Sequence, residues 1–163
     1  MAWLVHSVGS DPDLQRRLRA ELDAATGGAA LTAAALRDLP LLAATVTETL
    51  RLYPPAAISA RHVAQGFDFA GHRVAAGSLL VYSPYVTHRD PDIYDDPLTF
   101  APERWLDGAR RPPHEYLPFG GGSHRCIGSA MATTELSVML ARLLARGTFA
   151  VEEQRVRATS FAA

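Results

Sequence analysis

Apolar residues recur every three or four positions in three stretches of the chain, which is the pattern of amphipathic helices. The three stretches span residues 11–26, 38–53 and 127–146. Their apolar stripes are Leu14, Leu18 and Leu22; then Leu42, Val46 and Leu50; and finally Leu136, Leu140, Leu143 and Leu144. Asp11 and Pro12 are typical of a helix start, and Gly147 is typical of a helix end. We therefore expect three helices, each with one buried face.

Between the second and third helix the apolar period falls to two, which is typical of β-strands. Phe67 and Phe69 alternate with polar residues, and Leu79 and Val81 mark a further strand after a turn. Strands are therefore expected within residues 61–83. The tail of the chain, residues 148–163, has room for one more strand.

A long segment, residues 84–126, separates these strands from the last helix. It contains seven of the eleven prolines, all of them within residues 84–118. A compact domain rarely carries so long an irregular segment unless the segment is functional or disordered. Five aromatic residues are too many for a solvated linker; they are Tyr85, Tyr94, Phe100, Trp105 and Tyr116. We therefore predict an ordered loop wrapped over another part of the protein, with Trp105 and the tyrosines of the loop in the core.

The composition and charge of the chain indicate which class of protein it belongs to. The 163 residues are 48% hydrophobic and 20% charged, as in an ordinary globular domain. Sixteen basic residues stand against seventeen acidic ones, so nothing favours nucleic acid as a partner. No apolar stretch approaches the roughly 20 residues that span a bilayer, and the first residues lack the pattern of a secretory signal. The single cysteine, Cys126, cannot form an internal disulfide, which fits the reducing cytoplasm. We expect a cytoplasmic protein.

The segment Phe119-Gly-Gly-Gly-Ser-His-Arg-Cys-Ile-Gly128 carries the candidate chemistry. Its three consecutive glycines let the backbone adopt left-handed conformations and approach a large flat ligand closely. Cys126 directly precedes a predicted helix, whose free N–H groups stabilise a thiolate over a thiol. A lone cysteine is more often a buried, inert thiol, but this setting favours a nucleophile or a metal ligand.

Four chemistries compete for this segment. A nucleotide-binding glycine loop needs Lys-Ser/Thr after the glycines, and His124-Arg125-Cys126 stands there instead. A phosphate-transferring cysteine needs a downstream arginine in the loop, which residues 127–131 do not supply. A zinc site needs several Cys/His pairs, and only one histidine is close to the cysteine. Haem–thiolate ligation needs one cysteine, glycines and a group that binds a propionate, and this requirement alone is fully met.

Three motifs in this chain resemble those of the cytochrome P450 superfamily. The string FGGGSHRCIG resembles its haem-binding signature F-x-x-G-x-x-x-C-x-G, with Phe119, Gly122, Cys126 and Gly128 at the fixed positions. Glu48-Thr49-Leu50-Arg51 matches E-x-x-R, and Pro102-Glu103-Arg104-Trp105 resembles the P-E-R-F/W element. The i, i+3 spacing places Glu48 and Arg51 on one helical face. These motifs stand in the order that the family shows.

The resemblance implies a fold that is mainly α with a small antiparallel β part. It identifies residues 1–163 as the C-terminal, haem-binding portion of a single cytochrome P450 domain, truncated at both ends. The first residues are similar to the middle of the family's long central helix, and the acidic residue–threonine pair that activates oxygen does not occur in the chain.

For the site, the resemblance implies heme b with Cys126 as the axial ligand of the iron. Gly122 and Gly128 would surround the cofactor with Phe119, which packs beside the thiolate. His124 and Arg61 would each bind a haem propionate. Glu48, Arg51 and Arg104 would form a buried structural triad. The other basic residues, Arg125, His62, His72, His88 and His114, are interpreted as surface or hydrogen-bonded residues.

For activity, the resemblance implies a monooxygenase that inserts one oxygen atom of O₂ into a small organic substrate. The two electrons would come from a donor protein such as a ferredoxin or a flavin reductase. The alternative is a truncated, non-catalytic fragment that at most binds haem. A cysteine-nucleophile enzyme is disfavoured because no acid–base partner is placed for the thiol.

Overall fold

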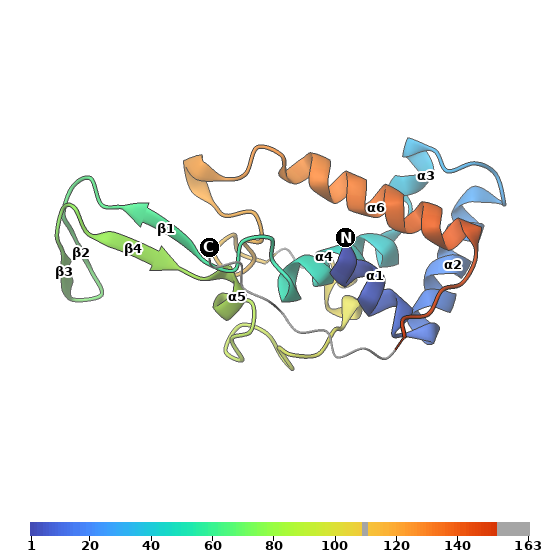
Figure 1. Ribbon diagram of the computed structural model, residues 1–163, viewed down its shortest axis with the longest axis horizontal. Helices are drawn as coiled ribbons and strands as arrows, with labels where there is room; N and C mark the ends of the chain where they lie inside the picture. The colour runs from blue at the N-terminus through green and yellow to red at the C-terminus, as the bar shows by residue number, and fades with distance from the viewer. Residues whose placement is uncertain (109–110, 153–163) are drawn as a thin grey trace.

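The computed structural model describes residues 1–108 and 111–152, and it is mainly helical with two small antiparallel sheets (Figure 1). Its α-helices are α1 (Ala2–Gly9), α2 (Pro12–Thr26), α3 (Ala33–Arg37), α4 (Pro40–Leu52), α5 (Pro84–Thr87) and α6 (Ser129–Arg146). Its strands are β1 (Ser59–His62), β2 (Phe67–Phe69), β3 (His72–Val74) and β4 (Leu79–Tyr82), and two 3₁₀ turns are η1 (Pro102–Trp105) and η2 (Gly122–His124). The predicted fold class is confirmed.

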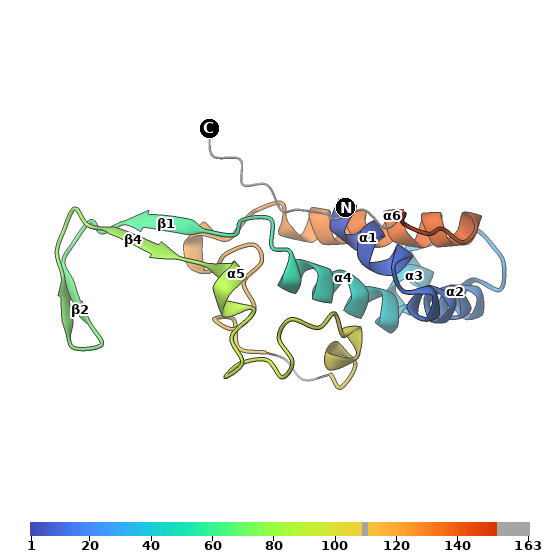
Figure 2. The same cartoon turned by 60° about the horizontal axis from the view of Figure 1, so that its bottom comes forward.

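The hydrophobic core lies where α1, α2, α4 and α6 pack against one another (Figure 2). The core residues on these helices are Leu4, Val8, Leu14, Leu18, Leu22, Leu41, Leu42, Val46, Leu50, Leu140, Ala141 and Leu144. The apolar stripes expected on the three helices therefore face inward, except that Leu136 and Leu143 are only half-buried. This core holds α4 and α6 side by side, and those two helices frame the candidate site.

The helix α4 depends on a neighbouring helix for its N-terminal cap. No side chain at its own N-terminus makes a capping hydrogen bond. The Glu21 carboxylate of α2 accepts hydrogen bonds from the backbone N–H groups of Leu41, at 2.6 Å, and Leu42, at 2.9 Å. A negative charge at the positive end of the helix dipole adds to this stabilisation. The cap therefore links the N-terminus of α4 to α2.

Replacing Glu21 by glutamine is expected to lower the free energy of unfolding by about 1 kcal/mol, because the charge and one of two acceptors are lost. Urea unfolding of the two proteins measures the difference. Asp23→Asn is the matched control, since it removes a carboxylate from an exposed position of the same helix. Equal destabilisation by both substitutions would contradict a specific role for the cap.

The strands form two antiparallel pairs that project from the helical body (Figure 1). β1 pairs with β4, with Ser59 opposite Tyr82, and β2 pairs with β3. The predicted boundary of 61–83 was wrong at its start, because pairing with Tyr82 extends β1 back to Ser59. Strand limits follow the reach of the partner strand, which the alternation of one strand does not reveal.

The part of segment 84–126 that contains η1 packs against α4 on the side away from α6, whereas the end of the segment leads into α6 (Figure 2). The prediction of a plain loop was incomplete, because the segment contains α5, η1 and η2. Pro84 and Pro102 occupy the first turns of α5 and η1, where a fixed φ favours helix and no N–H is needed. Tyr94 is fully buried and Tyr116 packs against the core, as expected, but Tyr85 is 45% exposed, so the core prediction was wrong for that residue. In the tail, residues 147–152 contain no strand, and the remainder of the tail lies outside the described residues.

Candidate functional site

Cys126 lies in a tight, glycine-rich turn that leads into α6. Its backbone N–H donates a 3.0 Å hydrogen bond to the carbonyl of Phe119, which closes the turn. Gly120 and Gly122 have φ angles of +73° and +64°, where residues with a side chain are strained. Gly128 is the N-cap residue of α6. The thiol therefore sits on a constrained loop, exposed, just before the N-terminus of a helix.

Cys126 shares a pocket of about 250 Å³ with three of the other predicted site residues. Arg61 enters it from β1, and Phe119 and His124 enter it from the cysteine loop, residues 117–126. The predicted residues Gly122 and Gly128 do not line this pocket. Gly122 lines a neighbouring hollow with Arg125, and an added Cβ at Gly128 would lie 3.8 Å from the Cys126 sulfur.

The Arg61 guanidinium faces this pocket without a carboxylate partner in the described part of the chain. It donates hydrogen bonds to the Ala60 carbonyl, at 2.8 Å, and to the Tyr82 hydroxyl, at 3.4 Å. It also lies over the Tyr82 ring, 5.6 Å from the ring centre. These neutral partners orient the cation and leave its charge uncompensated. The pocket therefore suits an anionic group next to the thiol.

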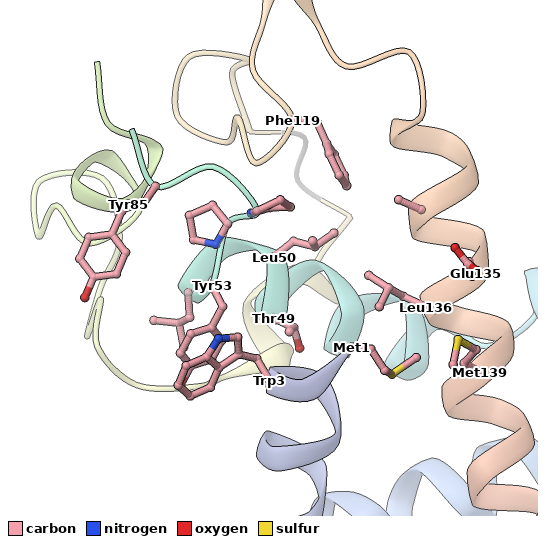
Figure 3. Close-up of a pocket in the computed structure, with 15 residues that line it drawn as sticks. Met1, Trp3, Thr49, Leu50, Tyr53, Tyr85, Phe119, Glu135, Leu136 and Met139 are labelled. Carbon is pink, nitrogen blue, oxygen red and sulfur yellow. The ribbon is translucent and has the colours of Figure 1, made fainter. Parts of the chain in front are cut away.

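A larger, mostly apolar pocket of about 660 Å³ lies on the other side of Phe119 (Figure 3). Its walls come from α1, α4 and α6, with Phe119 projecting into it from the cysteine loop. Trp3 and Tyr53 stack on each other with ring centres 4.2 Å apart. Sequence reasoning did not single out this wall, although Tyr53 directly precedes the Pro54-Pro55 pair. Phe119 and Pro55 line both pockets, so the two spaces adjoin.

The predicted triad is brought together behind this site. Glu48 and Arg51 have fully buried side chains and form a two-point ion pair, with Nε–Oε2 and Nη2–Oε1 distances of 2.8 Å. Arg104 adds a contact of 3.1 Å from its Nε to the Glu48 Oε1. The carboxylate also accepts hydrogen bonds from the Ala101 N–H and from the Trp105 indole N–H. One buried carboxylate thus accepts five hydrogen bonds, three at Oε1 and two at Oε2.

Burial works to raise the pKa of Glu48, but its hydrogen bonds and the charge of Arg51 outweigh this effect and lower the pKa below the ordinary value. The carboxylate is therefore ionised at neutral pH. Arg51 in turn donates to the carbonyls of His88, Pro97 and Thr99 at 2.6–3.0 Å. None of the triad residues lines the two pockets beside Phe119. The triad fastens segment 88–105 to α4.

His88 was interpreted as a surface or hydrogen-bonded histidine, and the structure places it fully buried with both ring nitrogens bonded. Its ring stacks on Tyr116, with ring centres 5.5 Å apart. Nothing in its local sequence distinguishes it from the exposed histidines, because its burial depends on segments far apart in the chain.

The described donors fit a haem with one thiolate ligand. No group of three or more His, Cys, Asp or Glu residues within 1–108 and 111–152 is arranged to hold a metal ion. A single exposed thiol beside an uncompensated arginine and a histidine matches an iron with an anionic periphery. The adjoining apolar space suits the body of a flat macrocycle. Over the same residues, no helix combines the length and apolarity needed to cross a bilayer.

The chain belongs to the cytochrome P450 family, whose sequence model matches residues 1–162. It is 46% identical to cytochrome P450 139 of Mycobacterium tuberculosis over 170 residues, which cover all of this chain and 40% of that protein. It is 36% identical to cyclooctat-9-en-7-ol 5-monooxygenase of Streptomyces melanosporofaciens, covering 90% of this chain and 32% of that one. A zebra fish cytochrome P450 solved with abiraterone superposes with a TM-score of 0.80 at 32% identity, over 88% of this chain and 34% of its own.

The predicted family is therefore confirmed, and membership supports a haem monooxygenase in general. The chain spans two-fifths or less of the length of these relatives.

Proposed function

We propose that this chain supplies the thiolate side of the haem pocket of a monooxygenase, with Cys126 as the axial ligand of heme b. The observation that carries the proposal is the shared pocket, in which the exposed Cys126 thiol lies with Arg61, His124 and Phe119. A helix N-terminus next to the cysteine favours the thiolate form that ligation requires.

Each residue then has one task. Cys126 holds the iron, and Arg61 and His124 bind the propionates. Phe119 packs beside the sulfur and separates it from the larger apolar space. Gly122 permits the left-handed turn, and Gly128 keeps side chains away from the sulfur. The Glu48–Arg51–Arg104 triad keeps the polypeptide behind the haem in place and takes no part in the reaction.

The whole protein would insert one atom of O₂ into a small organic substrate: RH + O₂ + 2e⁻ + 2H⁺ gives ROH + H₂O. A thiolate-ligated haem supplies the electron density that favours O–O cleavage. A ferredoxin or a flavin reductase would deliver the electrons, in the cytoplasm, where a single free cysteine stays reduced.

A second candidate is a haem-binding segment without turnover. One observation favours it: the apolar side chains of Ile127 and Met131, beside the cysteine loop, are exposed. In this case Cys126 would still ligate the iron, but no product would form.

The test is the spectrum of the haem-loaded protein, reduced under carbon monoxide. Wild-type protein is expected to show the red-shifted Soret band of thiolate ligation, and Cys126→Ser is expected to abolish it, because a serine hydroxyl does not ionise at neutral pH. Ser123→Ala, in the same loop, is the matched control and should keep the band. Retention of the band in Cys126→Ser would show that another group ligates the iron.

A further inference from the structure

A single buried ring, that of His88, connects α4 to the segment that carries the cysteine. Its Nδ1 lies 2.9 Å from the carbonyl oxygen of Arg51, near the C-terminal end of α4. Its Nε2 lies 2.9 Å from the backbone nitrogen of Leu117, the first residue of the cysteine loop. The two partners are 66 positions apart in the sequence, so the contact exists only in the folded chain.

The partners determine which nitrogen of the ring carries the proton. The Leu117 N–H can only donate, so the His88 Nε2 must be the unprotonated acceptor. The proton therefore sits on Nδ1, where it is donated to the Arg51 carbonyl. The neutral ring satisfies both contacts. A protonated ring would set its Nε2–H against the Leu117 N–H, and this hydrogen bond would be lost.

From Leu117 the chain of hydrogen bonds continues to the cysteine. The Leu117 carbonyl accepts from the Gly120 N–H at 3.0 Å, and the Phe119 carbonyl accepts from the Cys126 N–H at 3.0 Å. At the other end, the Arg51 guanidinium donates to the His88 carbonyl, so the ring and the backbone of His88 are both bound to α4. Hydrogen bonds through His88, Leu117 and Phe119 thus connect the buried ion pair to the backbone of Cys126.

We propose that His88 is a positioning residue that couples α4 to the cysteine loop, residues 117–126, and that protonation of its ring releases this loop. The relevance of this coupling to haem rests on the proposed function, whereas the coupling itself concerns the polypeptide alone.

The charges around the ring favour its neutral form at ordinary pH. Burial lowers the pKa of His88 to about 4, and the positive charges of Arg51 and Arg89 act in the same direction, against the hydrogen bond to the Arg51 carbonyl. Tyr116 stacks on the ring and Tyr94 meets its edge, and both hydroxyls are neutral because burial raises their pKa values. The buried carboxylate of Glu48, next to Arg51, already accepts hydrogen bonds from Arg51, Arg104 and Trp105.

The sign of the pH dependence follows. The folded-state pKa of about 4 lies below the ordinary value of about 6.5, so the unfolded chain binds the extra proton first as the pH falls. The coupling is complete at neutral pH. Stability is lost between about pH 6.5 and pH 4, and the ring is protonated in the folded chain near pH 4.

Amide hydrogen exchange of the 163-residue chain tests the coupling without haem. His88→Leu removes both ring contacts, and it is expected to reduce protection of the Leu117 amide by about tenfold or more at pH 7. His88→Gln keeps one donor and one acceptor and cannot be protonated, so it should retain this protection. His72→Gln, at an exposed histidine of β3, is the matched control and should change nothing.

The pH series decides between positioning and simple packing. In the wild type, protection of Leu117 relative to the α2 amides should fall as the pH approaches 4, and in His88→Gln it should not. Identical pH profiles for these two proteins would overturn the proposal, even if His88→Leu fails to fold. Unchanged Leu117 protection in a folded His88→Leu protein would overturn it as well.

The haem-loaded protein provides a separate readout. His88→Gln should lower the pH at which the thiolate-type carbon monoxide band disappears, whereas His72→Gln should leave that midpoint in place. An unshifted midpoint would overturn the link from His88 to the thiolate. Absence of the band in wild-type protein would count against Cys126 as a ligand, and the exchange experiment would still decide the role of His88.

Discussion

Replacement of Arg51 by leucine is expected to lower the free energy of unfolding by roughly 3–5 kcal/mol, since the buried Glu48 carboxylate loses its two-point ion pair and keeps only the single contact with Arg104. Arg51 and Glu48 are both 0% exposed, so water cannot replace the lost contacts. The three backbone carbonyls that accept from Arg51 would also be left unpaired. Because domains of this size are stable by only about 5–15 kcal/mol, a large part of the total would be lost.

Glu48→Gln should act in the same direction, because two guanidinium groups then share a neutral amide. Urea unfolding measures the loss, and haem content per polypeptide should fall in both variants because segment 88–105 is no longer fastened to α4. Arg73→Leu is the matched control, since Arg73 forms an ion pair with Asp68 at 3.1 Å with both side chains largely exposed. Such exposed pairs contribute little. Normal stability and haem content in Arg51→Leu would show that the ion pair is dispensable.

The second large effect concerns catalysis by these 163 residues alone. We expect that they consume oxygen without forming an oxygenated product. Ile127 is fully exposed and Met131 is 72% exposed, so the face of α6 beside the cysteine is open to water. Exposed apolar surface of this kind favours aggregation. Water at a reactive haem also competes with the substrate, because an open site does not exclude side reactions. Reduced oxygen should therefore leave as hydrogen peroxide.

The experiment supplies the isolated chain with haem, a reducing system and a panel of small organic substrates. Oxygenated products are identified by mass spectrometry, and oxygen consumption is compared with the hydrogen peroxide released. Cys126→Ser is the control for chemistry of loosely bound haem. Product formation that is coupled to oxygen consumption and depends on Cys126 would show that this part of the fold is sufficient.

Local sequence patterns determined the features that depend on neighbours along the chain. The stripes through Leu18, Val46 and Leu140 predicted three helices because helical periodicity is a local property. The signature from Phe119 to Gly128 indicated the haem–thiolate class because ligand type, glycines and helix start lie within ten residues. The resemblance added the expectation that Arg61 binds a propionate, which its own surroundings in the sequence do not indicate.

The tertiary structure alone decided the features that join distant segments. Glu21 caps α4 from α2, the start of β1 depends on Tyr82, and His88 bridges Arg51 and Leu117. Glutamate is ordinarily exposed and histidine is of intermediate burial, so the local sequence around Glu21 and His88 gives no sign of their distant partners. A polar side chain is buried only where the fold brings a matching donor or acceptor to it, so its role follows from packing and not from periodicity.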